Sequence, residues 1–198
     1  MSDPETPPPR RAVVVHGYQA APDRHWFPWL ARELGAQGIA VTVVALPDSD
    51  HPDVRSWSEA VAAAVGRVDA GTWLIGHSLG CVTVLRHLGG LAGPWSAAGV
   101  VLVAGFAEPL ASVPELASFL AEPLAPDACR RIADRVPVRR MIRSDADVFV
   151  PADASDRLAA AIGAPVTVVP GAGHFMGSDG VTEFPLVRDL VSGRERSL

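Results

Sequence analysis

The sequence has no lysine, only two cysteines, and no uninterrupted apolar run near the roughly 20 residues that a membrane-spanning helix needs. Two cysteines are too few for a disulfide framework. All 17 basic residues are arginines, and the formal net charge is −5 with a pI near 5.6. Because nucleic acids and anionic membranes bind basic surfaces, this charge balance predicts neither of them as a partner.

The first ten residues are rich in proline and carry acidic side chains, but they lack the apolar segment of a secretory signal peptide. We therefore predict a disordered leader at 1–10, a single domain at 11–193 and a tail at 194–198. We also expect a cytoplasmic location and a monomer or small homo-oligomer.

Strand-like and helix-like stretches alternate along the chain. Such alternation predicts an α/β fold, with a doubly wound sheet of about six parallel strands flanked by helices. Five prolines within 107–137 favour short helices there. The expected strands are 11–16, 40–46, 72–75, 98–103, 138–143 and 165–169, and the expected helices are 28–37, 53–70, 79–88, 153–162 and 184–191.

One segment organises the rest of the chain, namely Gly76-His77-Ser78-Leu79-Gly80. It joins a buried strand to an apolar helix, which is the context of a nucleophile elbow. The two glycines permit close approach of neighbouring backbone, and the tight turn exposes the serine hydroxyl. We therefore expect Ser78 to be a catalytic nucleophile.

A serine needs a base to remove its proton and a third group to orient that base. Among six histidines we favour His174, because it follows the last strand and completes the order Ser, Asp, His. The acid is expected in the loop after the fifth strand, where Asp147 is preferred and Asp145 stays an alternative. Both aspartates could instead stabilise the turn through hydrogen bonds from the backbone to their side chains.

The other histidines receive structural or solvent-exposed roles. His77 and His87 are expected to pack or to form hydrogen bonds, and His77 should point away from the nucleophile. His16 is expected to have a structural role beside the site, whereas His25 and His51 lie in loops and could simply be solvated.

The oxyanion of a tetrahedral intermediate would be bound by two backbone N–H groups, those of Leu79 and Tyr18. Other residues near the strand ends could line an acyl pocket, although ordinary core packing is at least as good an interpretation for the aromatic residues and the methionine among them. They are Gly17, Gln19, Trp26, Trp29, Phe106, Phe175 and Met176.

Three segments together resemble the small α/β-hydrolases related to retinoblastoma-binding protein 9 and their bacterial esterase-like members. They are His16-Gly17-Tyr18-Gln19, His25-Trp26-Phe27-Pro28-Trp29-Leu30 and Gly173-His174-Phe175. The elbow segment is a further part of the resemblance. The resemblance implies a minimal hydrolase without a large cap domain. It also implies a Ser78, Asp147 and His174 triad and no metal or organic cofactor.

One feature of the vertebrate relative is absent. Its retinoblastoma-binding motif has the form Leu-x-Cys-x-Glu, but the nearest segment here, 79–83, ends in threonine. We therefore predict no such partner.

These observations lead to the expectation of a serine hydrolase that cleaves small carboxylic esters through an acyl-enzyme on Ser78. Amide, peptide or thioester cleavage would use the same residues. A protein that kept the scaffold as a catalytically silent binding module is the alternative from another class.

Overall fold

The computed structural model describes residues 10–194. The predicted leader and tail therefore lie outside the described residues, except for Arg10 and Arg194. Six strands form one sheet, in which every neighbouring pair is parallel and the order is β2-β1-β3-β4-β5-β6. They are β1 (Arg11–Val15), β2 (Ala40–Val43), β3 (Thr72–His77), β4 (Gly99–Val103), β5 (Val138–Ser144) and β6 (Val166–Val169).

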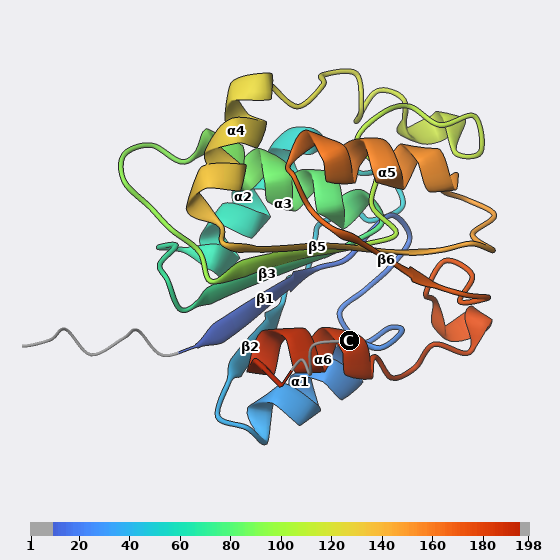
Figure 1. Ribbon diagram of the computed structural model, residues 1–198. Helices are drawn as coiled ribbons and strands as arrows, with labels where there is room; N and C mark the ends of the chain where they lie inside the picture. Colours follow the sequence, from blue (N-terminus) through green and yellow to red (C-terminus); the bar gives the residue numbers. More distant parts are fainter. Residues whose placement is uncertain (1–9, 195–198) are drawn as a thin grey trace, which may run out of the picture.

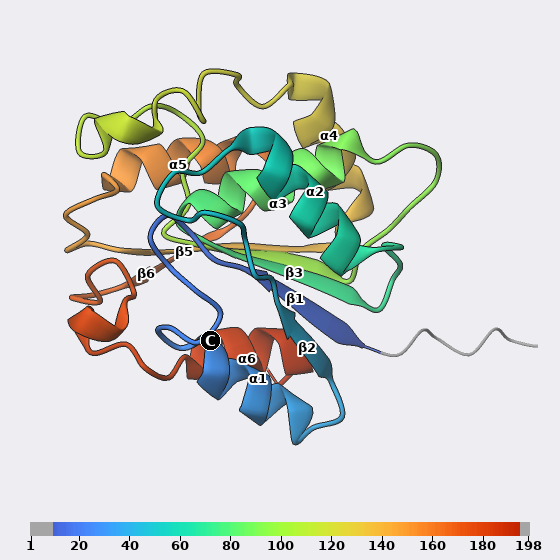
Figure 2. The same ribbon diagram turned by 180° about the vertical axis from the view of Figure 1, so that it is seen from behind.

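Helices cover both faces of the sheet (Figures 1 and 2). Helices α1 (Phe27–Gly35) and α6 (Pro185–Ser192) lie on one face. The opposite face carries α2 (Val54–Val65), α3 (Leu79–Gly90), α4 (Pro126–Arg135) and α5 (Ala152–Ala161). Two short 3₁₀ turns, η1 (Pro114–Leu116) and η2 (Gly177–Asp179), lie in the long loops. The predicted α/β-hydrolase architecture is confirmed, and no large cap domain is present in residues 10–194.

Two apolar cores fill the spaces between the sheet and its helical layers. One centres on α2 and α3 and includes Trp57, which is fully buried. The other lies under α1 and α6 and includes Trp26 and Phe175, both also fully buried. Burial of side chains this large stabilises the fold by roughly 1.5–3 kcal/mol for each.

Two predicted elements end three or more residues earlier than expected, whereas every other predicted bound lies within two residues of the structure. Helix α2 was expected to reach residue 70 but ends at Val65, because Gly66 follows with φ +59°, a conformation that ends the helix. Strand β2 stops at Val43 instead of residue 46. None of the helices in residues 10–194 is long and apolar enough to cross a bilayer.

Candidate functional site

Ser78 occupies the turn between the central strand β3 and helix α3. Its backbone adopts φ +55° and ψ −126°, which an L residue rarely takes up. The turn packs so tightly that a Cβ on Gly80 would lie 2.1 Å from the carbonyl oxygen of Val15. A Cβ on Gly76 would lie 2.6 Å from the Cα of Cys81. Both glycines of the elbow are therefore required by close backbone approach.

The loop after β1 passes directly beside the serine. A Cβ on Gly17 would lie 2.8 Å from the Cβ of Ser78 and 3.2 Å from its hydroxyl oxygen. Tyr18 follows, and no hydrogen bond in the described part of the chain engages its N–H. Leu79 is the first residue of α3, where an N–H has no partner within the helix. The two N–H groups expected to bind an oxyanion are thus available.

The loops after β5 and β6 bring a carboxylate and an imidazole together. Asp147 Oδ2 lies 2.7 Å from Nδ1 of His174, and the two side chains are only 4% and 8% exposed. The second oxygen, Oδ1, accepts hydrogen bonds from the N–H groups of Phe149 and Val150 at 2.9 and 3.0 Å. The carboxylate is therefore fixed, and the proton on Nδ1 leaves Nε2 as the acceptor nitrogen of His174.

Asp145 has a different contact. Its Oδ1 accepts a hydrogen bond from the N–H of Gly171 at 2.8 Å, which ties the loop after β5 to the loop after β6. Of the two aspartates left open by the sequence, Asp147 is the one beside the imidazole.

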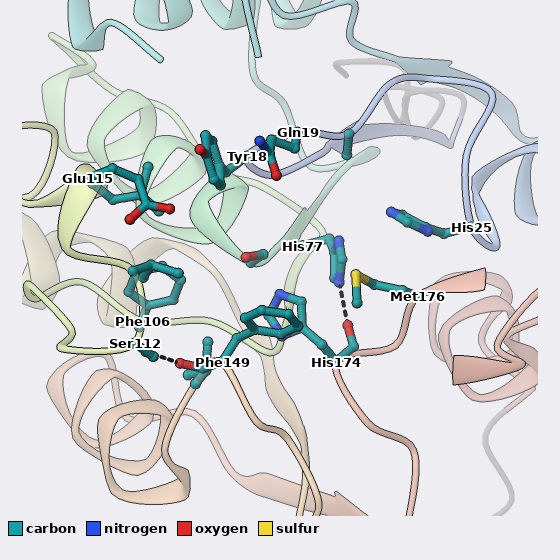
Figure 3. A pocket seen from close by; sticks show the side chains of 15 residues that line it. Tyr18, Gln19, His25, His77, Phe106, Ser112, Glu115, Phe149, His174 and Met176 are labelled. Atoms are coloured by element: carbon teal, nitrogen blue, oxygen red, sulfur yellow. Dashed lines mark hydrogen bonds between the residues drawn. The ribbon is translucent and has the colours of Figure 1, made fainter. Parts of the chain in front are cut away.

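A cavity of about 280 Å³ opens at the carboxyl ends of the strands (Figure 3). Ser78 and His174 both line it. No hydrogen bond between their side chains is present among residues 10–194, and such bonds are often long before substrate binds. The remaining lining residues are Tyr18, Gln19, Ala20, His25, His77, Phe106, Ser112, Val113, Glu115, Leu116, Phe149, Val150 and Met176.

The expected pocket residues divide into two groups. Gln19, Phe106 and Met176 line the cavity, and Gly17 packs behind Ser78. The expectation does not hold for Trp26, Trp29 and Phe175, which lie in the apolar core under α1 and α6 and are at most 8% exposed. Their aromatic rings fill space between helices and sheet, so none of them is in the cavity wall.

Sequence reasoning missed one wall of the cavity. Ser112, Val113, Glu115 and Leu116 come from the proline-rich segment before α4, in and around η1. Ser112 donates a hydrogen bond from its hydroxyl to the carbonyl of Phe149, which joins this wall to the loop of Asp147. No local sequence signal marks these residues, because only the folded path of the segment brings them over the strand ends.

Two histidines treated as peripheral also lie in the wall. His77 was expected to pack or to form hydrogen bonds, and Figure 3 shows its imidazole bonded to the backbone carbonyl of His174, at 2.8 Å. For His25, a loop residue that could simply have been solvated, Nδ1 accepts a hydrogen bond from the N–H of Gly177 at 3.0 Å. His16 matches its structural role, because its Nδ1 bonds the carbonyl of Gly17 at 2.9 Å.

Burial sets the protonation of these imidazoles. Desolvation lowers the pKa values of His16 and His25, and it lowers the pKa of His77 well below its ordinary value. The nearby His174 adds to the lowering of the pKa at His25 and His77. These three rings are therefore neutral near pH 7. In residues 10–194 no cluster of His, Cys, Asp or Glu is arranged to hold a metal ion.

The pattern of the family described as serine hydrolase matches residues 12–193. The chain belongs to the serine hydrolase family. The YdeN protein of Bacillus subtilis (strain 168) is 31% identical over 183 residues, which are 92% of this chain and 95% of YdeN. The crystal structure of the ydeN gene product matches with a TM-score of 0.87 over 93% of this chain and 97% of that chain. The resemblance to relatives of retinoblastoma-binding protein 9 is consistent with this family.

Two more distant structures share the fold. Est1E from Butyrivibrio proteoclasticus, solved with ferulic acid bound, is 12% identical and has a TM-score of 0.70, covering 93% of this chain and 87% of its own. The monoacylglycerol lipase of Paleococcus ferrophilus is 17% identical and has a TM-score of 0.67, covering 96% and 97% of the two chains. At these identities the likeness concerns the arrangement of strands and helices.

Proposed function

We propose that this serine hydrolase cleaves small carboxylic esters through an acyl-enzyme on Ser78. The observation that carries the proposal is the buried Asp147–His174 pair, whose imidazole lines the same cavity as a serine held in a strained turn. A hydroxyl, an imidazole and a carboxylate from three separate loops are the groups that acyl transfer needs.

In the first half of the reaction, the hydroxyl oxygen of Ser78 attacks the ester carbon and its proton passes to Nε2 of His174. Asp147 holds the imidazole in the required tautomer and stabilises the positive charge that forms. The N–H groups of Leu79 and Tyr18 would bind the oxyanion, a role in which one donor contributes about 2.7–4 kcal/mol. The proton on Nε2 then goes to the departing alcohol.

In the second half, a water molecule attacks the acyl carbon while Nε2 takes one of its protons. Collapse of the second intermediate releases the carboxylic acid and returns the proton to the oxygen of Ser78. No metal or organic cofactor is needed for this sequence of steps.

The cavity supports a limited class of substrates. A volume of about 280 Å³ is small for a ligand pocket, which favours short acyl groups over long lipid chains. Glu115 is the only carboxylate among the lining residues described, and no arginine is among them. We therefore extend the proposal to esters that are neutral or positively charged near the scissile bond. A cytoplasmic location and a monomer or small homo-oligomer stay predictions from the sequence.

A direct test combines labelling with turnover. We expect a fluorophosphonate probe to label the native enzyme, and p-nitrophenyl esters of two to four acyl carbons to be cleaved faster than longer ones. Ser78→Ala should abolish both reactions, and His174→Ala should abolish turnover. A product burst from p-nitrophenyl acetate that survives Ser78→Ala would refute the mechanism. A failure of the probe to label the folded protein would favour the silent binding module instead.

A further inference from the structure

The main chain of His174, in the loop after β6, is held by two side chains. Its N–H donates to Oδ2 of Asp179 at 2.9 Å, and its carbonyl accepts from Nε2 of His77 at 2.8 Å. Figure 3 shows the second bond as a dashed line. Because Asp147 already binds Nδ1 of the ring, the backbone and the ring of His174 are anchored at three points.

His77 is the residue directly before Ser78, although it lies 97 positions from His174 in the sequence. Its side chain is in the interior, with only 2% of the residue exposed. The partner of Nε2 is a carbonyl, so Nε2 carries the proton and donates. Nδ1 has no hydrogen-bond partner in the described part of the chain. Among the described residues, the hydrogen bond to the carbonyl of His174 is therefore the one that this buried ring forms.

Asp179 organises the other side of the same loop. Its Oδ2 also accepts from the N–H of Met176 at 3.0 Å, so one oxygen fixes two amides. Gly173 has φ +56°, and a Cβ there would lie 2.5 Å from the carboxyl carbon of Asp179. The absence of a side chain at residue 173 is what lets the carboxylate reach the N–H of His174.

We propose that His77 and Asp179 are positioning residues that set the separation of the His174 imidazole from the Ser78 hydroxyl. His77 is covalently next to the nucleophile and hydrogen-bonded to the backbone of the base, so it links the two directly. A displacement of about 1 Å between reacting groups can cost about 100-fold in rate. This inference rests on the proposed function, in which Ser78 and His174 react together.

Replacements that differ only in the hydrogen bond test the role of His77. His77→Leu removes the donor, whereas the amide nitrogen of His77→Gln can occupy the place of Nε2. We expect His77→Leu to lower kcat about 100-fold while KM for p-nitrophenyl acetate changes less than about twofold. His77→Gln should regain at least about tenfold of that loss. The control is His87→Leu, which changes a half-buried imidazole of α3 outside the cavity and should leave kcat unchanged.

A parallel pair tests Asp179. Asp179→Asn keeps an oxygen acceptor for the two amides and should stay within about tenfold of the native kcat, whereas Asp179→Ala should lose about 100-fold. Circular dichroism and thermal melting establish that each variant is folded. If His77→Leu does not fold, the comparison of the Asn and Ala variants at residue 179 decides the outcome.

Crystal structures of His77→Leu and Asp179→Ala give a readout that does not depend on activity. We expect the imidazole of His174 to move relative to the oxygen of Ser78, while the Asp147 contact persists. An unmoved imidazole, or a kcat within twofold of the native value in a folded His77→Leu enzyme, would overturn the proposal. Activity that survives Ser78→Ala would instead refute the proposed function, and the crystallographic comparison would still decide the positioning role.

Discussion

The carboxylate oxygen Oδ2 of Asp147 lies 2.7 Å from Nδ1 of His174, whereas Asp145, two residues earlier, bonds the N–H of Gly171. We therefore expect Asp147→Asn to lower kcat by about 10³–10⁴-fold, because the amide cannot stabilise the imidazolium or hold its tautomer. Asp145→Asn should cost about tenfold or less, since it weakens only one bond between two loops. Steady-state kinetics of the two variants make the comparison, and equal losses would contradict these roles.

The backbone of Ser78 stores strain that depends on its Cβ. With φ +55° and ψ −126°, the residue is in a region where a Cβ costs of order 1–3 kcal/mol. Ser78→Gly removes that cost and Ser78→Ala retains it. Glycine also gives the unfolded chain more conformational entropy, which offsets part of this gain. The Gly variant should therefore be more stable than the Ala variant by about 1 kcal/mol. Urea denaturation of the two inactive variants measures the difference, and a more stable Ala variant would exclude strain at this turn.

The two ends of helix α3 tolerate a methyl group very differently. A Cβ on Gly80 would lie 2.1 Å from the carbonyl oxygen of Val15, whereas a Cβ on Gly90 would meet nothing within 4 Å. Gly80→Ala should destabilise the fold by about 3 kcal/mol or more, because backbone must move to relieve the contact. Gly90→Ala should be neutral or stabilising by up to about 1 kcal/mol. Thermal unfolding distinguishes the two, and a well-folded Gly80→Ala protein with native activity would contradict the packing argument.

Glu115 should select substrates by charge. Glu115→Gln keeps the shape of the wall and removes its negative charge, so kcat/KM for acetylthiocholine should fall about threefold to fivefold. The uncharged isostere 3,3-dimethylbutyl thioacetate is the matched control substrate and should be unaffected. The preference of the native enzyme for acetylthiocholine over this uncharged substrate should also decrease as salt is added. If both substrates respond equally to the substitution, Glu115 does not act through charge.

The buried histidines make stability depend on pH. Because the pKa values of His16, His25 and His77 are lowered in the folded state, the unfolded chain binds more protons below its own histidine pKa, near 6.5. The contribution of these neutral histidines to the free energy of unfolding is therefore complete above pH 6.5, and it is lost as the pH falls below that value. Each fully buried ring contributes at most about 1.4 kcal/mol per pH unit, and the partly exposed His25 contributes less.

Urea denaturation at pH 7.5, 6.5 and 5.5 measures this slope. His77→Gln should reduce the slope whatever it does to the stability at pH 7.5, since one of the responsible rings is gone. A free energy of unfolding that is constant or increases between pH 6.5 and 5.5 would contradict the lowered pKa values.

The sequence predicted the sheet and the elbow because their signals are local. Buried parallel strands are continuous apolar runs, and a glycine pair around a serine marks a tight turn wherever it occurs. The pairing of Asp147 with His174 could be anticipated from the order Ser, Asp, His along the chain, from the family resemblance, and from the rule that chemistry gathers at the carboxyl ends of parallel strands. The distance and orientation of the two groups could be obtained only from the structure.

The walls of the cavity could not be predicted in the same way. Trp26 and Phe175 are adjacent in sequence to site residues, yet their rings turn into the core, since large apolar surfaces are stabilised by burial. Glu115 and Ser112 carry no motif, and they reach the cavity through the folded path of a proline-rich segment. A hydrogen-bonding role was expected for His77, but its partner could not be predicted because it is a backbone carbonyl 97 residues away.

The proposed nucleophile and base follow two strands that differ in how many neighbouring strands they pair with. Ser78 follows β3, which has strands on both sides, whereas His174 follows β6, a four-residue edge strand that pairs only with β5. Val166 and Val168 of that edge are 38% and 42% exposed. Partial opening of the molecule should therefore begin at β6 and separate the imidazole from an intact elbow. In increasing urea, catalysis would then stop while the fluorescence of the buried tryptophans still reports a folded protein.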